Sequence, residues 1–179
     1  MKRLSTLTLV AALLVGCAPS KRLMNTTMSP DITLPDRPRI AVLPMELAGY
    51  ADDDLTVIRQ NWRNMVESGF LENSFRVVDR DVVDNILKEQ HFQKSGVVNT
   101  ATSVEVGKIL GINLVLMGTV RVLAADGSKF HVQLRIINVQ SAELMATTFA
   151  TGDPAIGYAA AFELAKKLKA KFNTQEKAT

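Results

Sequence analysis

Cysteine and histidine are scarce in this sequence of 179 residues, which contains one cysteine and two histidines. A single cysteine excludes an intramolecular disulfide, so the chain must fold by burying apolar side chains. His91 and His131 are too few for a zinc site, because such a site needs three or four convergent protein ligands. The sequence therefore predicts neither a disulfide nor a metal centre.

Motifs of catalysis are also missing. The chain has no phosphate-binding loop of the GxGxxG or GKS/T type and no GxSxG nucleophile. The run Asp52, Asp53 and Asp54 makes a poor calcium site, because calcium needs 6–8 oxygens from a shaped loop. Acidic residues at a helix N-terminus explain the run better. We therefore expect no catalytic residues, no cofactor and no enzymatic activity.

The formal net charge of +3 overstates how basic the mature chain is. Without Lys2 and Arg3, which belong to the first segment, 19 basic side chains remain against 18 acidic ones. No basic stripe alternates with aromatic residues, as it would in a nucleic-acid-binding protein. The composition therefore predicts no nucleic-acid partner.

The apolar run from Leu4 to Val15 is too short to cross a bilayer, which takes about 20 helical residues. It follows two basic residues and ends in Leu14-Val15-Gly16-Cys17, which is typical of a bacterial lipoprotein signal. We predict that residues 1–16 are removed between Gly16 and Cys17, and that Cys17 carries a covalent lipid with acyl chains such as palmitate. The alternative is an ordinary cleaved signal in which Cys17 is a bystander.

Residues 17–38 are predicted to be the lipidated N-terminus and a flexible linker, because they hold four of the six prolines and show no apolar period. The 21 residues after Cys17 span at most about 75 Å. As a flexible coil they span about 25 Å. The folded domain is expected over residues 39–173, followed by a frayed tail over 174–179.

Apolar patterns predict five strands and four helices in this domain. The strands are expected at 39–45, 75–78, 112–120, 130–136 and 144–151. Helices are expected from the aspartate run to Gly69, from Asp79 or Asp81 to Leu87, from a capping box at Thr102–Glu105 to Gly111, and from Pro154 to Phe172. Residues 46–51 and 91–100 are expected to be loops.

The order of these elements predicts a three-layer α/β domain with a mixed sheet of about five strands. Helical crossovers make the first strands parallel. The last three strands follow one another through tight turns such as Asp126-Gly127, so they should form an antiparallel meander. A C-terminal helix closes the domain.

The strands of the meander offer a candidate partner-binding face. Polar residues alternate there with apolar ones, so one side of the sheet should be wet. A solvated sheet face without a partner is the alternative interpretation. The candidate residues are Arg121, His131, Gln133, Arg135, Thr147 and Phe149.

Several short segments, in the right order, resemble the CsgG/HfaB family of outer-membrane lipoproteins, which are related to the curli secretion channel. They are Ile40–Pro44, Val77–Arg80, Ile86–Gln90, Ser95-Gly96, Val106–Gly111, Met117–Val120 and Leu134–Val139. The resemblance runs from about Arg39 to Gly152. The domain is also similar to LpoB, the activator of penicillin-binding proteins, and to the N-terminal domain of TolB. It implies a fold like TolB's N-terminal domain or an anticodon-binding domain.

The resemblance implies a lipoprotein of the outer membrane that faces the periplasm and acts by binding proteins. Ala18 lacks the aspartate that family sorting rules associate with the inner membrane. The short link from Val120 to Phe130 leaves no room for the channel's membrane hairpins, and Tyr50 alone matches its constriction loop, so we expect no pore. The implied partners are secretion or appendage subunits, and oligomerisation is compatible with the pattern. Activation of a penicillin-binding protein remains the alternative.

Overall fold

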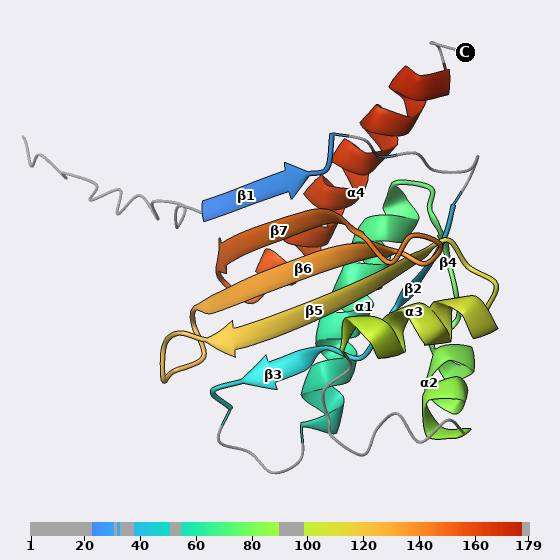
Figure 1. Ribbon diagram of the computed structural model, residues 1–179. Helices are drawn as coiled ribbons and strands as arrows, with labels where there is room; N and C mark the ends of the chain where they lie inside the picture. The colour runs from blue at the N-terminus through green and yellow to red at the C-terminus, as the bar shows by residue number, and fades with distance from the viewer. Residues whose placement is uncertain (1–22, 31, 33–37, 51–54, 90–98, 177–179) are drawn as a thin grey trace, which may run out of the picture.

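The computed structural model describes residues 23–30, 32, 38–50, 55–89 and 99–176. Its helices and strands are drawn in Figure 1. In chain order they are β1 (Leu23–Met28), β2 (Arg39–Val42), β3 (Glu46–Ala48), α1 (Thr56–Glu72), β4 (Arg76–Val77), α2 (Arg80–Glu89), α3 (Thr100–Ile109), β5 (Leu114–Val122), β6 (Phe130–Asn138), β7 (Leu144–Gly152) and α4 (Ile156–Glu176).

The strands form one mixed sheet between two layers of helices (Figure 1). Its order is β1-β7-β6-β5-β2-β4, and β3 pairs with the far end of β5. The pairs of β2 with β4 and of β5 with β2 and β3 are parallel, whereas β5, β6, β7 and β1 run antiparallel. The three-layer mixed fold predicted from sequence is confirmed, but the sheet has seven strands rather than about five.

Two apolar cores lie on the two sides of the sheet. The larger one packs α1 and α4 against strand residues such as Leu116 and Leu134, with Trp62 and Phe70 from α1. The smaller one packs α2 and α3 against residues such as Val115. Leu114 to Met117 are all buried, because β5 is covered on both faces at its start.

The predicted flexible linker over residues 17–38 is wrong for part of its length. Leu23–Met28 form β1, which pairs with β7 from Leu23↔Thr151 to Met28↔Ala146. Met24 and Met28 pack against the larger core, while the residues between them alternate toward solvent. Ile32, only 2% exposed, belongs to the same core. The sequence did not predict this strand, because its six residues include only three apolar ones and lie in a segment rich in proline and polar residues. The strand forms because β7 offers it backbone hydrogen bonds.

Three other boundaries differ from the sequence prediction. Glu46–Ala48, expected in a loop, form β3 along Thr119–Arg121. The N-cap of α3 is Asn99 rather than Thr102. The Asn99 Oδ1 accepts a hydrogen bond from the Thr102 N–H at 2.9 Å. The helix α4 continues to Glu176, beyond the expected end at Phe172.

The helices α1 and α4 approach closely at Gly69. A Cβ atom at this position would lie 2.7 Å from the backbone nitrogen of Phe162 and 2.8 Å from the Cβ of Ala161. Backbone atoms cannot move aside as the end of a flexible side chain can. Gly69 is therefore required by the close contact of the two helices rather than by its backbone angles.

Gly69→Ala should destabilise the domain by about 1–3 kcal/mol, because the added methyl group overpacks the helix contact. At an open helix position the same change would stabilise by about 0.5–1 kcal/mol. Urea unfolding measures the difference, with the exposed neighbour Ser68→Ala as control. An unfolding midpoint for Gly69→Ala at or above that of the wild type would show that the helices do not touch there.

A buried arginine joins the two helical layers past the β4 edge of the sheet. Arg63 of α1, 4% exposed, donates from Nη1 to the Asp84 Oδ1 of α2 at 2.7 Å. Its Nε lies 3.2 Å from the Glu67 Oε1 one turn further along α1. Burial raises the pKa of the Glu67 carboxyl, and the positive charge of Arg63 only partly offsets this.

Glu67→Gln should gain stability relative to the wild type as the pH rises from about 4 to about 7. The native carboxyl keeps its proton above its usual pKa, so folding becomes less favourable as the pH rises through and beyond the unfolded pKa. Urea unfolding at several pH values measures this, with Glu163→Gln on the α4 surface as the matched variant. A gap between Glu67→Gln and wild type that stays constant with pH would contradict it.

Candidate partner-binding face

The structure brings all six predicted interface residues to one side of the antiparallel strands. Arg121 of β5 lies opposite His131 of β6, and Gln133 lies opposite Phe149 of β7. Arg135 is paired with Thr147 in the next row. The residues between them, such as Val132 and Leu134, point to the larger core on the other side. The six residues therefore share one side of the sheet, and their role in binding a partner stays a prediction.

Half of this side of the sheet is covered and half is open. The helices α2 and α3 cover the first part of β5 and the end of β6 through Met117 and Ile137. Within the described part of the chain, no helix packs over the rest of the face, which continues across β7 to β1. Asn25 and Thr27 of β1 extend it with exposed polar side chains.

An aromatic residue stands out on the open half. Phe149 is 40% exposed, and its ring stacks on the imidazole of His131 with centroids 6.1 Å apart and planes at 24°. The Nδ1 of His131 lies 3.0 Å from the Thr151 Oγ1. The imidazole ring of His131 is therefore held by both Thr151 and Phe149. A fixed aromatic pair on a flat surface loses little conformational entropy when a partner covers it.

The two arginines of this face are not used inside the domain. Arg121 is exposed and Arg135 half-buried, and neither side chain makes a hydrogen bond or ion pair within the described residues. Glu46, the one carboxylate on this face of β1, β3 and β5–β7, accepts instead from the Thr119 hydroxyl at 3.2 Å. Free guanidinium groups favour carboxylates, which they bind with two parallel hydrogen bonds.

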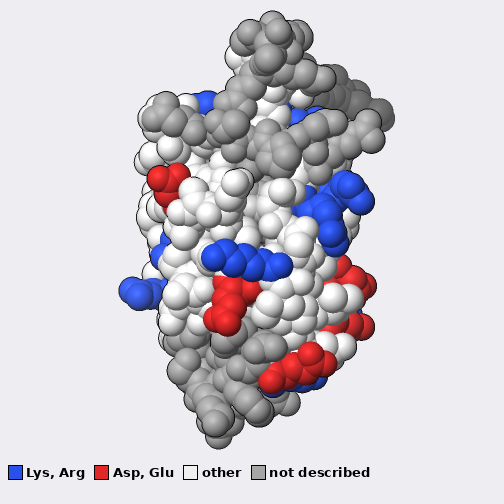
Figure 2. All heavy atoms as spheres, turned by 45° about the vertical axis from the view of Figure 1, so that its right-hand side comes forward, with Lys and Arg blue, Asp and Glu red and all other residues white. Residues whose placement is uncertain are grey.

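Charge on the surface shown in Figure 2 is otherwise mixed. Lys and Arg side chains are interspersed there with Asp and Glu and with uncharged residues, and they form no continuous basic area. This fits the small net charge of the chain. Among the strands β1, β3 and β5–β7, the candidate face carries Arg121 and Arg135 against the single carboxylate of Glu46.

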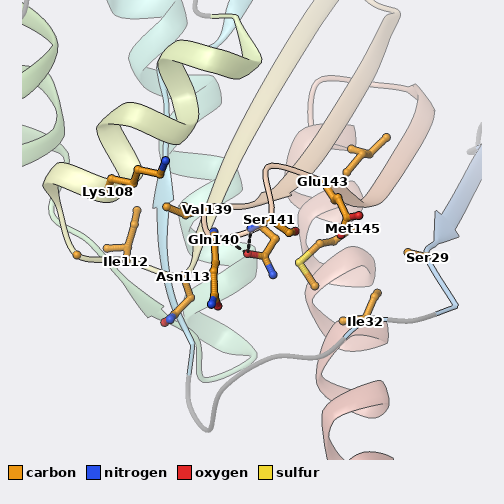
Figure 3. A pocket seen from close by; sticks show the side chains of 13 residues that line it. Ser29, Ile32, Lys108, Ile112, Asn113, Val139, Gln140, Ser141, Glu143 and Met145 are labelled. Carbon is orange, nitrogen blue, oxygen red and sulfur yellow. Dashed lines mark hydrogen bonds between the residues drawn. The ribbon is translucent and has the colours of Figure 1, made fainter.

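A hollow of about 880 Å³ lies at the other end of the sheet (Figure 3). Its floor is apolar, with Ile112, Val139 and Met145 all buried. Lys108 and Glu143 stand on its rim. Sequence reasoning missed this site, because its lining comes from three segments that are far apart in the chain and carry no common motif.

Tyr50, the residue compared with a channel constriction, is engaged within the domain. The indole N–H of Trp62 donates to its hydroxyl at 2.9 Å, and its ring stacks on Phe130 at 6.5 Å. Burial raises the pKa of the Tyr50 hydroxyl. The side chain therefore belongs to the larger core rather than to a free loop.

Several predicted residues lie outside the described part of the chain: Gly16, Cys17, Asp52, Asp53, Asp54 and His91. Among the described residues, no three His, Cys, Asp or Glu side chains gather closely enough to hold a metal ion. None of the helices in the described segments has the length and apolar character needed to span a membrane.

Comparisons with solved structures identify the fold. The PelC dodecamer from Paraburkholderia phytofirmans is similar, with a TM-score of 0.52, 13% identity, and coverage of 83% of this chain and 98% of that one. Lipoprotein GNA1162 from Neisseria meningitidis has a TM-score of 0.50, 17% identity, and coverage of 77% and 96%. The C-terminal domain of LpoB from Escherichia coli reaches 0.47 with 13% identity, over 64% and 82%.

Sequence comparison gives a match to one family model over part of the chain. No curated protein matches the chain. Residues 65–128, from the middle of α1 to the loop after β5, match the family model described as curli production assembly/transport component CsgG. The match is shorter than the resemblance from Arg39 to Gly152 that the sequence motifs indicate. The predicted resemblance of this chain to the CsgG family is thereby confirmed for its central segment, within a fold shared with PelC and GNA1162.

Proposed function

We propose that this protein is an outer-membrane lipoprotein that faces the periplasm and binds other envelope proteins during assembly or export of a surface structure. The open sheet face carries the proposal, because it presents the exposed ring of Phe149 and the side chains of Arg121 and Arg135, which make no ion pair inside the described domain. The protein acts by binding and is not an enzyme. The lipid on Cys17 attaches it to the membrane.

The position of β1 supports a role close to the membrane. Five residues, 18–22, separate Cys17 from Leu23, where the strand begins, so the two Cα atoms lie at most about 20 Å apart. The linker expected from sequence spans about 75 Å when fully extended. A short tether disfavours the alternative role, activation of a penicillin-binding protein across the periplasm, because that role needs a long reach.

Two features support a protein that does not itself form a pore. The connection from β5 to β6 holds seven residues, Leu123–Lys129, and one membrane-spanning strand alone needs about 9–11. Tyr50 is hydrogen-bonded to Trp62 and therefore does not line an opening. The domain is better suited to dock on a secretion or appendage subunit than to replace one.

The chemistry of the face indicates the kind of partner. Its two free guanidinium groups and its near lack of carboxylates fit an acidic protein surface. Other copies of this chain are a second set of partners, since the similar PelC structure is a dodecamer. Self-association is compatible with docking, because the open face is only one side of the domain.

The double variant Arg121→Glu/Arg135→Glu should lose the partner, because it replaces the two free cations with carboxylates facing an acidic surface. Crosslinking of the native lipoprotein in cells, followed by mass spectrometry of the captured proteins, measures the loss. We expect the yield of the main crosslinked envelope protein to fall about tenfold or more, as one lost charge pair costs several kcal/mol.

The matched control is Lys166→Glu/Lys167→Glu, which reverses two exposed charges on α4 and should leave capture unchanged. Equal loss in both variants would mean that net charge rather than the sheet face decides binding. Capture of a penicillin-binding protein would favour the alternative role. Detergent-stable rings of the protein alone would contradict the absence of a pore.

Cys17→Ser should release a folded domain into the periplasm, because the lipid is proposed to be the essential anchor. Fractionation of cells and the mass of the mature N-terminus measure this. If the serine variant remained with the membrane fraction in cells that lack the captured partner, Cys17 would not be the anchor.

A further inference from the structure

The first residue of β1 fixes which end of the domain lies near the membrane. Leu23 pairs with Thr151 near the end of β7, and Gly152 pairs with Phe130 at the start of β6. Phe130 in turn pairs with Val122 at the end of β5. The β5–β6 loop therefore lies at the same end of the sheet as the start of β1, as Figure 1 shows.

The opposite end of the sheet carries the hollow described above. The β6–β7 turn lies there, with Ser141 and Leu144 on the lining of the hollow. Nine residues in each of β6 and β7 separate the two ends by about 27 Å. This length exceeds the reach of about 20 Å that the five residues between Cys17 and Leu23 allow.

The end of the sheet at which β1 begins presents apolar side chains to solvent. Leu23 is 68% exposed and Leu123 50% exposed, and they flank the sheet end from β1 and from the β5–β6 loop. The two ends of the loop are joined, since the Leu123 N–H donates to the Lys129 carbonyl at 2.9 Å. Its charges nearly balance, with Lys129 against Asp126, whose carboxylate accepts from the Ser128 N–H.

We infer that this end of the domain rests on the bilayer surface, with Leu23 and Leu123 at headgroup level and the hollow turned to the periplasm. The occupant is the lipid surface itself, because the lipidated residue can lie no further than the tether allows. Two leucines add weak apolar contacts to an anchor that already holds the protein. The inference rests on the proposed lipidation of Cys17.

The test uses the full lipoprotein reconstituted in vesicles of phosphatidylethanolamine and phosphatidylglycerol. The lipid occupies the only native cysteine, so Ala125→Cys in the β5–β6 loop or Ser141→Cys in the β6–β7 turn takes a single fluorophore. A nitroxide on the lipid headgroup should quench the label at residue 125 several-fold more than the label at residue 141. Equal quenching at both positions, or stronger quenching at 141, would overturn the orientation.

Two leucines of nearly equal exposure distinguish direct contact of this end with the lipid from mere closeness to the bilayer. With the label at residue 125, Leu123→Asn should reduce quenching clearly, whereas Leu144→Asn should not, although the two leucines are exposed to 50% and 51%. Unchanged quenching in Leu123→Asn would overturn the contact. A protein that carries no lipid by mass spectrometry and does not float with vesicles would instead refute the proposed anchor, which keeps the two failures distinct.

Discussion

The pairing of β1 with β7 is the constraint on which the rest of this structure depends. It places residues 23–28 inside the domain, aligned from Leu23↔Thr151 to Met28↔Ala146. The strand extends the larger core with Met24 and Met28, and Lys171 of α4 fixes the chain just after it by donating to the carbonyls of Ser29 and Pro30. A segment that would otherwise be a tether thus becomes part of the fold, and Cys17 lies only a few residues from the domain.

The open sheet face depends on the same strand. The helices α2 and α3 cover the parallel half of the sheet on this side, and β1 widens the uncovered antiparallel half. Two arginine side chains without ion-pair partners and the stacked rings of His131 and Phe149 lie on that half. This exposed polar sheet face supports the proposed docking with neighbouring envelope proteins.

Much of this architecture follows from the sequence. Period-two patterns in β6 and the near-continuous apolar run of β5 predict both their strands and the face on which Arg121, His131 and Arg135 meet. Features that depend on distant partners do not. β1 and β3 form strands because β7 and β5 offer them backbone hydrogen bonds. Both are short and lie among proline and polar residues, so neither shows an apolar pattern from which a strand could be predicted. The hollow beside Ile112 escapes prediction for the same reason.

Hydrogen exchange of the β1 amides in the native protein tests the central claim most directly. The Ser29 N–H donates to the Met145 carbonyl at 2.8 Å, and antiparallel pairing alternates, so the amides of Asn25 and Thr27 also point to β7. The account predicts slow exchange at Asn25, Thr27 and Ser29 and faster exchange at Met24 and Thr26 on the outer edge. Uniformly fast exchange from residue 23 to residue 29 would show a free linker and contradict it.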